Sequence, residues 1–321
     1  MGYTLPQTIN WSQTFIEYAP LSAGTAFEPA ISVATMVRNT ILNAPFTWPW
    51  NRNEYLISTG TPPNLVAGQQ DYVFTIPDFA YLEKVSLLTA DGNRGFELKD
   101  VYNRNILGLT GVQPSQQAEP NSAAVKFYNP GSTVAVRFLS NPDQSYTGTL
   151  TYQKLAIPFT FFNFEEVLVL SNVAYYTFSN LQNYPVNYFA GQNITVTGFD
   201  NLSNNGVFLC LSSTNTYLIL VNPAAATDIH VATGMNLDWF PLPDSFMDVF
   251  NNLFLAEAMA VVDDAREQVY RQRGIAALLS KAEGLNEMQI NAFLAQSIAR
   301  GTVQQTMAAQ RTQQGTQARG I

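Results

Sequence analysis

The chain has 321 residues, of which 46% are hydrophobic and 12% are charged, with a formal net charge of −8. This length and apolar content predict about two or three folded domains and exclude a disordered chain. The acidic balance argues against a protein that grips nucleic acid by neutralising phosphates, because such proteins carry basic stripes. The acidic charge remains compatible with a protein past which DNA slides without being bound.

Amide and hydroxyl side chains take the place of the missing charges. They cost less to desolvate than ions, so they suit large permanent contacts between subunits. A secreted β-protein shares this bias, and composition leaves both interpretations open. The single cysteine, Cys210, excludes an internal disulfide, and its apolar neighbours predict a buried strand position.

Residues 1–28 predict an extended arm that docks on another surface, with Trp11 and Phe15 among its aromatic contacts. The first six residues lack the basic start and apolar run of a signal peptide. No uninterrupted apolar stretch reaches membrane-spanning length. We therefore expect a soluble protein that is made in the cytoplasm and has no membrane partner.

Apolar residues at helical spacing predict a helix over residues 30–42, with Pro29 in its first turn and Pro45 beyond its end. Trp48 and Trp50 follow this helix. We expect the two rings to anchor the helix on a β-region, with a ligand platform as the alternative.

Alternating apolar and polar residues, punctuated by Gly and Pro, predict strands from Tyr55 to Tyr152. An Asn-Pro-Asp turn at residues 141–143 joins a strand over residues 134–138 to a strand over residues 150–154.

Residues 159–238 predict an inserted β-domain, either a small antiparallel barrel or a sandwich. Three short alternating segments lie near residues 194–199, 207–211 and 216–221, and Asn204-Asn205-Gly206 is a hairpin signal. The two ends of such an insertion must lie close together to rejoin the parent fold.

Apolar residues at intervals of three and four predict a long amphipathic helix from Asp244 to Arg273. Gly274 and Gly284 weaken its continuity, and a second helix is expected over residues 285–300. Residues 301–321 are rich in Gln, Thr, Gly and Ala, so they cannot build a core. They are either disordered or ordered only against a partner.

No catalytic, metal-binding or cofactor-binding constellation is predicted. His230 is the only histidine and lies in a strand-like stretch, so a structural role is expected. Asp263 and Asp264 point about 100° apart on a helix and cannot easily share one ion. We expect a solvated face there, with one Asp near Arg266 or Arg271. No phosphate-binding loop is present, and the chain is not expected to be an enzyme.

Four short patterns occur in a fixed order along the chain. G-x-x-x-Y at residues 68–72 precedes Pro77-Asp78-Phe79, and P-D-x-x-Y-x-x-x-L-x-Y covers residues 142–152. L-P-D-x-F at residues 242–246 and D-D-x-R-x-x-x-Y at residues 263–270 follow. Together they resemble the head-to-tail adaptor (connector) family of tailed bacteriophages, which includes tail tubular protein A. The resemblance covers residues 30–158 and 239–273.

The resemblance implies an α+β fold: a helical bundle of one N-terminal and two C-terminal helices with an antiparallel β-domain. The adaptor core would comprise residues 29–158 and 239–300, with the inserted barrel or sandwich at residues 159–238 and a flexible tail at residues 301–321. It also implies a structural virion protein at the head-tail junction. Such proteins form a homo-oligomeric ring, usually of twelve copies, below the portal protein. The ring joins the portal to a downstream tail or nozzle protein, and DNA passes through its channel.

Within this interpretation the tail is the expected portal-docking element. Met307 and Ile321 would supply apolar anchors, and Arg311 and Arg319 would pair with portal carboxylates. The N-terminal arm around Trp11 and Phe15 is the alternative docking element. The alternative function is a virion carbohydrate- or receptor-binding (tail decoration) protein, because the middle of the chain is β-rich and rich in Tyr, Asn and Thr.

Overall fold

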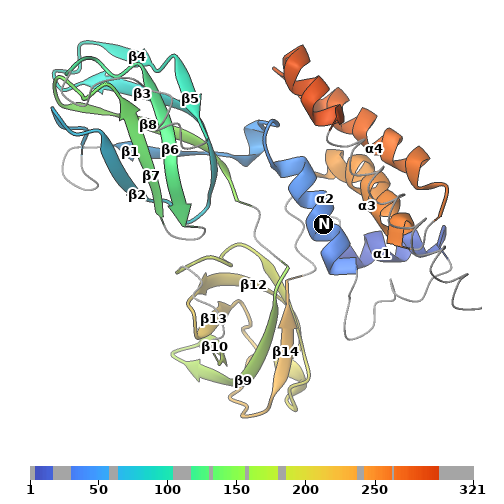
Figure 1. Cartoon of the computed structure of the whole chain (residues 1–321). Helices are drawn as coiled ribbons and strands as arrows, with labels where there is room; N and C mark the ends of the chain where they lie inside the picture. Colours follow the sequence, from blue (N-terminus) through green and yellow to red (C-terminus); the bar gives the residue numbers. More distant parts are fainter. Residues whose placement is uncertain are drawn as a thin grey trace, which may run out of the picture.

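Helices and strands occupy separate parts of the computed structural model, an α+β protein with antiparallel sheets and a closed β-barrel (Figure 1). Each part has a hydrophobic core of its own: one among the helices, one in a β-sandwich and one in the barrel. The structure describes residues 4–16, 30–57, 64–103, 117–129, 133–155, 159–179, 186–236, 242–261 and 264–295.

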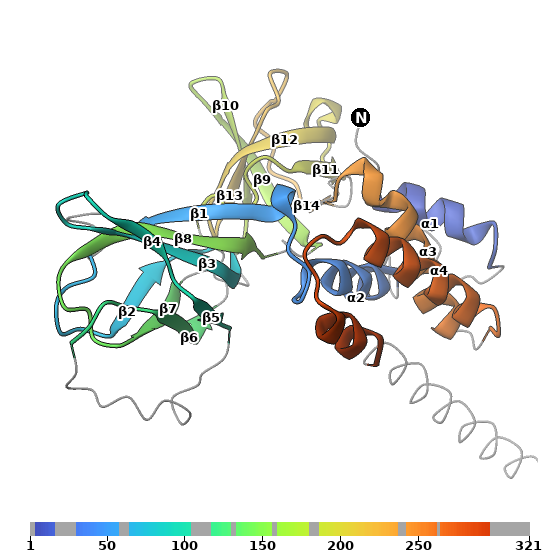
Figure 2. The same cartoon turned by 90° about the horizontal axis from the view of Figure 1, so that it is seen from above.

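The helices share one core, and α3 contacts each of the other three named helices. Figure 2 shows them together at one side of the molecule, away from the strands of the sandwich. A further helical segment covers residues 287–295, and its Phe293 is buried in the same core. The named helices are α1 (Leu5–Gln13), α2 (Ala30–Leu42), α3 (Met247–Val261) and α4 (Glu267–Lys281).

Helix α1 corrects the expectation of an extended arm over residues 1–28. Thr4 caps the helix, since its hydroxyl accepts from the Gln7 backbone N–H at 3.4 Å while the Gln7 side chain accepts from the Thr4 N–H at 2.9 Å. Such a reciprocal cap stabilises a helix start by about 1 kcal/mol. Leu5 and Ile9 are then buried in the helical core. Residues 17–28 lie outside the described part of the chain.

The long C-terminal helix expected from Asp244 to Arg273 is instead two helices. After a short 3-10 turn, η4 (Asp244–Phe246), α3 ends at Val261 and α4 begins at Glu267. Gly274 does not break α4; a Cβ there would lie 2.6 Å from Leu253 Cδ2, so its absence lets α3 and α4 approach closely. The second helix expected over residues 285–300 is present over residues 287–295, and residues 296–300 are outside the described part.

Two four-stranded sheets form the sandwich, in the orders β1-β8-β3-β4 and β2-β7-β6-β5. Every pairing is antiparallel except β5 with β6, which is parallel, so the expected antiparallel β-domain carries one parallel edge pair. The strands are β1 (Arg52–Ile57), β2 (Asp71–Thr75), β3 (Phe79–Thr89), β4 (Gly95–Glu97), β5 (Asp100–Tyr102), β6 (Ser122–Asn129), β7 (Thr133–Leu139) and β8 (Tyr146–Lys154).

The Asn-Pro-Asp turn at residues 141–143 joins β7 to β8, as expected. The two strands do not pair with each other, because β7 belongs to one sheet and β8 to the other. The turn therefore carries the chain across the sandwich rather than closing a hairpin. Strand alternation predicted both strands, but it contains no information on which neighbours they choose.

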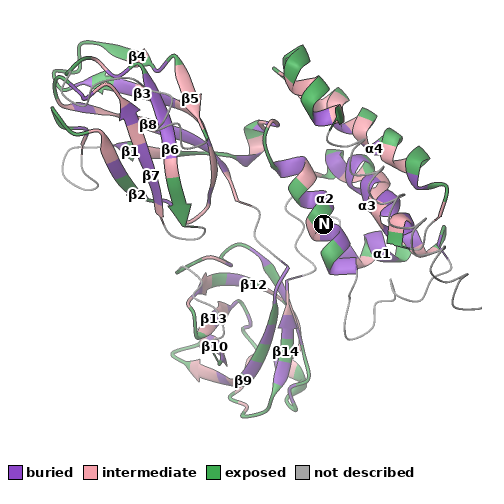
Figure 3. Cartoon of the chain, viewed as in Figure 1, coloured by how far each residue is buried: buried purple, intermediate pink, exposed green. Residues whose placement is uncertain are grey.

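The second β-region is a closed barrel in the order β10-β13-β12-β11-β14-β9, so the sandwich alternative for this segment is wrong. Cys210 lies on β12 and is buried, as its apolar neighbours predicted. Figure 3 shows buried positions alternating with exposed ones along the barrel strands. The strands are β9 (Phe161–Leu170), β10 (Val173–Phe178), β11 (Asn193–Thr197), β12 (Gly206–Ser213), β13 (Tyr217–Leu220) and β14 (Ala232–Met235).

The barrel begins and ends at one place, because Phe161 at the start of β9 pairs with Met235 at the end of β14. The helical and sandwich cores contain no side chain from between these two residues. We therefore predict that residues 162–234 can be replaced by a short Gly/Ser link between adjacent chain ends, since loop-closure cost changes slowly with length. The shortened chain should keep a cooperative thermal transition by circular dichroism.

A wider deletion of residues 159–236 provides the matched comparison. It also removes Phe159, which is buried in the helical core, so its melting temperature should be lower than that of the first variant. Loss of cooperative melting in the narrower deletion would show that the barrel belongs to the core of the whole chain.

Candidate functional site

Trp11 and Phe15, the expected partner contacts near the N-terminus, lie against the chain's own helices. Their ring centroids are 5.0 Å apart, and the Phe15 ring is 6.2 Å from that of Tyr270 on α4. Arg266 Nη2 donates to the Phe15 carbonyl oxygen at 3.1 Å. Phe15 still exposes 36% of its surface. The pair therefore fixes the end of α1 on α4, and its role as a partner contact stays a prediction.

The other expected docking residues are Met307, Arg311, Arg319 and Ile321. All four lie outside the described residues, which end at residue 295. Their role as portal contacts stays a prediction from the sequence.

An aromatic cluster joins the segment after α2 to the start of α3. The ring of Phe246 lies 4.9 Å from that of Trp48 and 5.3 Å from that of Trp50, edge to face in both cases. Trp48 Nε1 also donates to the Ile41 carbonyl oxygen at 2.7 Å, so its indole is satisfied although buried. The tryptophans therefore pack on the helical core and not on the core of the sandwich.

Hydrogen bonds through Gln153 connect this aromatic cluster to the sandwich. Buried Gln153 on β8 accepts from the Trp48 backbone N–H at 3.2 Å and donates through Nε2 to Glu83 Oε2 at 2.8 Å. Glu83 in turn accepts from Arg52 Nε at 3.0 Å. Since one amide side chain is held at both ends, the joint between the helices and the sandwich has a defined geometry. No sequence pattern singled out Gln153.

A buried amide joins the two ends of the barrel segment to each other, and an arginine of α2 contacts the residue that precedes them. The Asn236 side chain accepts from the Thr160 backbone N–H at 2.7 Å and donates to Gln192 Oε1 at 2.7 Å. Beside it, the Arg38 guanidinium of α2 lies 4.9 Å from the centre of the Phe159 ring. Burial lowers the pKa of Arg38 to about 10. An arginine in a helix normally reads as a solvent-exposed residue, so the sequence carried no signal for this contact.

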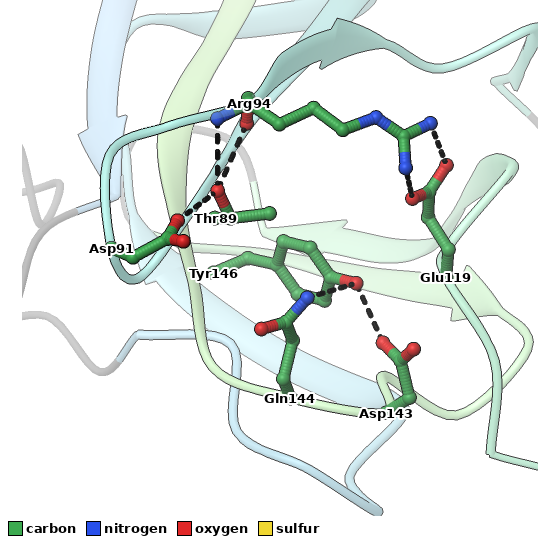
Figure 4. A network of polar contacts seen from close by, with 7 residues as sticks. All are labelled: Thr89, Asp91, Arg94, Glu119, Asp143, Gln144 and Tyr146. Atoms are coloured by element: carbon green, nitrogen blue, oxygen red, sulfur yellow. Dashed lines mark hydrogen bonds and ion pairs between the residues drawn. The ribbon is translucent and has the colours of Figure 1, made fainter.

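The P-D-x-x-Y pattern has a structural explanation in the turn between β7 and β8. The buried Tyr146 donates its hydroxyl to Asp143 Oδ1 at 2.6 Å, and its backbone N–H donates to the Leu65 carbonyl oxygen at 3.0 Å. Burial, and then Asp143, raise the pKa of Tyr146 to about 12. Figure 4 shows this turn beside the β3–β4 loop, with sticks for Thr89, Asp91, Arg94, Glu119, Asp143, Gln144 and Tyr146.

Basic side chains in the described part mostly face carboxylates. Asp71 on β2 accepts from Arg137 Nε at 2.6 Å and from Lys126 Nζ at 2.9 Å. Arg137 foremost, together with Lys126, lowers the pKa of Asp71 to about 2. Further pairs are Arg52–Glu83, Lys84–Glu97, Arg94–Glu119, Lys281–Asp248 and Arg271 with Glu257 and Glu267. Few cations remain to grip a phosphate backbone.

The prediction that one acidic residue of the pair lies near Arg266 is confirmed for Asp264, but this residue lies between α3 and α4 and not on a helix face. Its Oδ2 lies 2.6 Å from Arg266 Nη2, and its Oδ1 accepts from the Arg266 backbone N–H at 2.9 Å. The hydrogen bond of Arg266 lowers the pKa of Asp264. Asp263 lies outside the described residues.

His230 does not occupy the strand position expected for it. It precedes β14 on an exposed loop, where Nδ1 lies 2.7 Å from Asp228 Oδ1 and Nε2 lies 2.8 Å from Asp200 Oδ2. The Asp228 contact, helped by the charge of Asp200, raises the pKa of His230. The imidazole therefore clamps the loop after β11 to the loop before β14. Periodicity missed this because neighbouring Ile229 and Val231 are apolar yet exposed.

Within the described residues, no group of three or more His, Cys, Asp or Glu side chains is arranged to hold a metal ion. No helix in that part of the chain is long and apolar enough to span a bilayer.

Comparison with models of known protein families and with curated proteins finds no match to this chain.

The His230 clamp predicts a pH-dependent contribution to stability. Because the folded pKa is raised, the contribution should be complete below the unfolded value of about 6.5 and lost as pH rises through the folded value. The melting temperature of the wild type should therefore exceed that of His230→Gln by more at about pH 5.5 than at about pH 8.5. Asp228 has a lowered pKa, so it does not titrate in this window.

Asp200→Asn is the matched control, because it removes one of the two carboxylates and should reduce the pH dependence only in part. A melting difference that does not change with pH would show that the clamp contributes nothing through charge.

Proposed function

We propose that this chain is a subunit of a bacteriophage head-to-tail adaptor, a structural protein of the virion and not an enzyme. Copies of the chain would form a closed homo-oligomeric ring below the portal protein. By analogy with the adaptor family, the ring would contain twelve copies. The ring would connect the portal to a downstream tail or nozzle protein at the head-tail junction. DNA would pass through its channel during ejection, without sequence-specific binding.

The observation that carries this proposal is that the adaptor-like patterns, far apart in the sequence, supply the joints of one framework. Asp78 accepts the hydroxyl proton of Tyr152 at 2.6 Å, which fixes β3 against β8. Leu242 and Phe246 of the L-P-D-x-F pattern are buried in the helical core, and Phe246 meets Trp48. Short patterns that match by chance have no reason to converge on joints in this way.

The helices support the proposal as the expected bundle of the adaptor core. Helix α2 corresponds to the expected N-terminal helix, whereas three helical segments, α3, α4 and residues 287–295, occur where two C-terminal helices were expected, and α1 is an additional helix on α3. The Thr8 hydroxyl donates to Asn251 Oδ1 at 3.1 Å across the contact of α1 with α3. A bundle held in this way can form a rigid wall between ring neighbours.

The electrostatics suit a lumen through which DNA moves. No lysine or arginine occurs between Lys154 and Arg266, a stretch that includes the whole barrel. The basic residues of the sandwich are largely paired with carboxylates, as at Asp71. Phosphate contacts repeated around a ring would add up and hold DNA in place, and this distribution of charge avoids them.

The second candidate is carbohydrate or receptor binding by the barrel. It is favoured by the exposed apolar side chains of Leu202, Ile229 and Val231 on the joined loops at one end of the barrel. These loops are braced, since Asn204 Nδ2 donates to the Ala226 carbonyl oxygen at 2.8 Å. A preorganised loop end of this kind can present a binding surface.

Mass photometry of the full-length chain, alone and with the portal protein of the same phage, tests the first proposal. Rings are expected under at least one of these conditions. Monomers under both conditions would contradict the adaptor proposal. Monomers or trimers that retain glycans on an array would favour the second candidate.

Truncation after Arg300 tests the docking role of residues 301–321. The segment is rich in Gln, Thr, Gly and Ala and is not expected to build a core, so the truncated chain should melt within a few degrees of the full-length protein. It should no longer co-elute with the portal protein in size-exclusion chromatography, because Met307, Arg311, Arg319 and Ile321 are removed.

Full-length chains that carry Phe15→Ser provide the comparison, because they keep the tail and alter only the exposed ring near the N-terminus. Portal binding that survives the truncation and fails in Phe15→Ser would transfer the docking role to Trp11 and Phe15.

A further inference from the structure

The barrel has one apolar outer side, which we call the apolar flank. Along β12, Leu209 and Leu211 expose 43% and 59% of their surface, while Cys210 between them exposes 1% and belongs to the barrel core. The outward positions of β13 continue this side, because Leu218 and Leu220 are the buried ones. The apolar flank comprises Val207, Leu209, Leu211, Tyr217, Ile219 and Val221.

Strand register makes the apolar flank continuous. The backbone N–H of Val221 donates to the Leu209 carbonyl oxygen at 2.9 Å, which places the two side chains on neighbouring strands. Ile219 pairs with Tyr175 on β10, and the rings of Tyr175 and Tyr217 lie 5.4 Å apart. The apolar surface therefore runs from β12 across β13 to β10.

Strands β11 and β14 of the same barrel present a polar outer surface and provide an internal comparison, whereas β9 beside them exposes Phe161 and Leu170 only at its two ends. The outward residues of β11 are Asn193, Thr195 and Thr197, and Thr233 faces out from β14. The hydroxyls of Thr197 and Thr233 lie 3.3 Å apart. The barrel interior is filled by its own core, so the fold does not need apolar residues on its outside. A continuous apolar surface over adjoining strands, on the outside of a barrel whose interior is already filled, marks a contact site.

We propose that the apolar flank is a self-association surface, which packs against the same flank of a second copy of this chain. The barrel strands and loops carry Glu165, Glu166, Asp200 and Asp228 but no lysine or arginine. Contact through most other faces would bring acidic groups of two barrels together. Contact through the uncharged flank buries apolar surface on both copies and keeps the carboxylates apart.

The position of the carboxylates argues against a basic protein as the partner of the apolar flank. Glu166 pairs with Thr177, which pairs with Tyr217, so this carboxylate lies at the margin of the apolar flank and not within it. A basic partner would find no ion pair at the centre of the flank. An identical flank offers a matching uncharged surface, and a twofold arrangement gives each copy the same contacts. This pairing does not depend on the proposed ring.

Cysteine crosslinking tests the pairing in the full-length protein. Cys210 is the only native cysteine, and burial raises the pKa of its thiol to about 12, so it stays unreactive. Single variants Val207→Cys, Leu209→Cys and Leu211→Cys place a thiol along β12. Near a twofold axis, at least one should form a disulfide-linked dimer under mild oxidation, seen on non-reducing gels.

Thr197→Cys, on the polar side, is the matched control and should stay largely uncrosslinked. In sedimentation velocity, Leu209→Asp should weaken association at least tenfold relative to Thr197→Asp, with both variants still melting cooperatively. The proposal is overturned if none of the three flank cysteines crosslinks, or if Thr197→Cys crosslinks equally well. Ring mass is scored separately, so failure of the adaptor proposal would leave these results interpretable.

Discussion

The contact of Phe246 with Trp48 and Trp50 is the interaction on which the rest of the structure depends. It closes a loop that contains the entire sandwich and the entire barrel. Loop-closure entropy grows only slowly with length, so the burial of a few aromatic rings, each stabilising by about 1.5–3 kcal/mol, can offset it. Because this contact holds α2 beside α3, the chain between them, which forms the sandwich and the barrel, must leave the helical core and return to it.

Buried contacts connect each β-part to the helices or close it at its ends. Gln153 binds the sandwich to Trp48, Arg38 of α2 lies against Phe159 before the barrel, and Asn236 ties the two barrel ends together at Thr160. Buried amides are costly unless both ends are hydrogen-bonded, so each joint favours one arrangement over its neighbours. For an assembly subunit this matters, because contacts between copies require that the parts of each copy keep a fixed orientation.

Positive charge is unevenly distributed along the chain. The stretch between Lys154 and Arg266 has carboxylates and no lysine or arginine, while most cations elsewhere in the described residues are engaged in pairs. The outside of the barrel therefore presents apolar groups, hydrogen-bonding groups and carboxylates. This property is consistent both with a channel that does not hold DNA and with association through an uncharged flank.

Local patterns in the sequence were sufficient for most elements. Periodicity located α2 and three of the six barrel strands, β11, β12 and β13, and the apolar setting of Cys210 predicted its burial. The sequence also contains a signal for helix α1, since Thr4 and Gln7 form a capping box. The scattered aromatic residues of this segment instead favoured the prediction of an extended arm. The break between α3 and α4 was missed because helical spacing of apolar residues continues through it.

The sequence by itself determined α2, the β-character of residues 55–152, that the middle segment is a separate β-structure, and that charge is scarce. The tertiary structure alone decided that β7 and β8 lie in different sheets, that Arg38 is buried against Phe159, and that His230 joins two loops. The reason is physical. Periodicity reports which side of an element is apolar, whereas strand partners and buried polar contacts depend on residues far away in the chain.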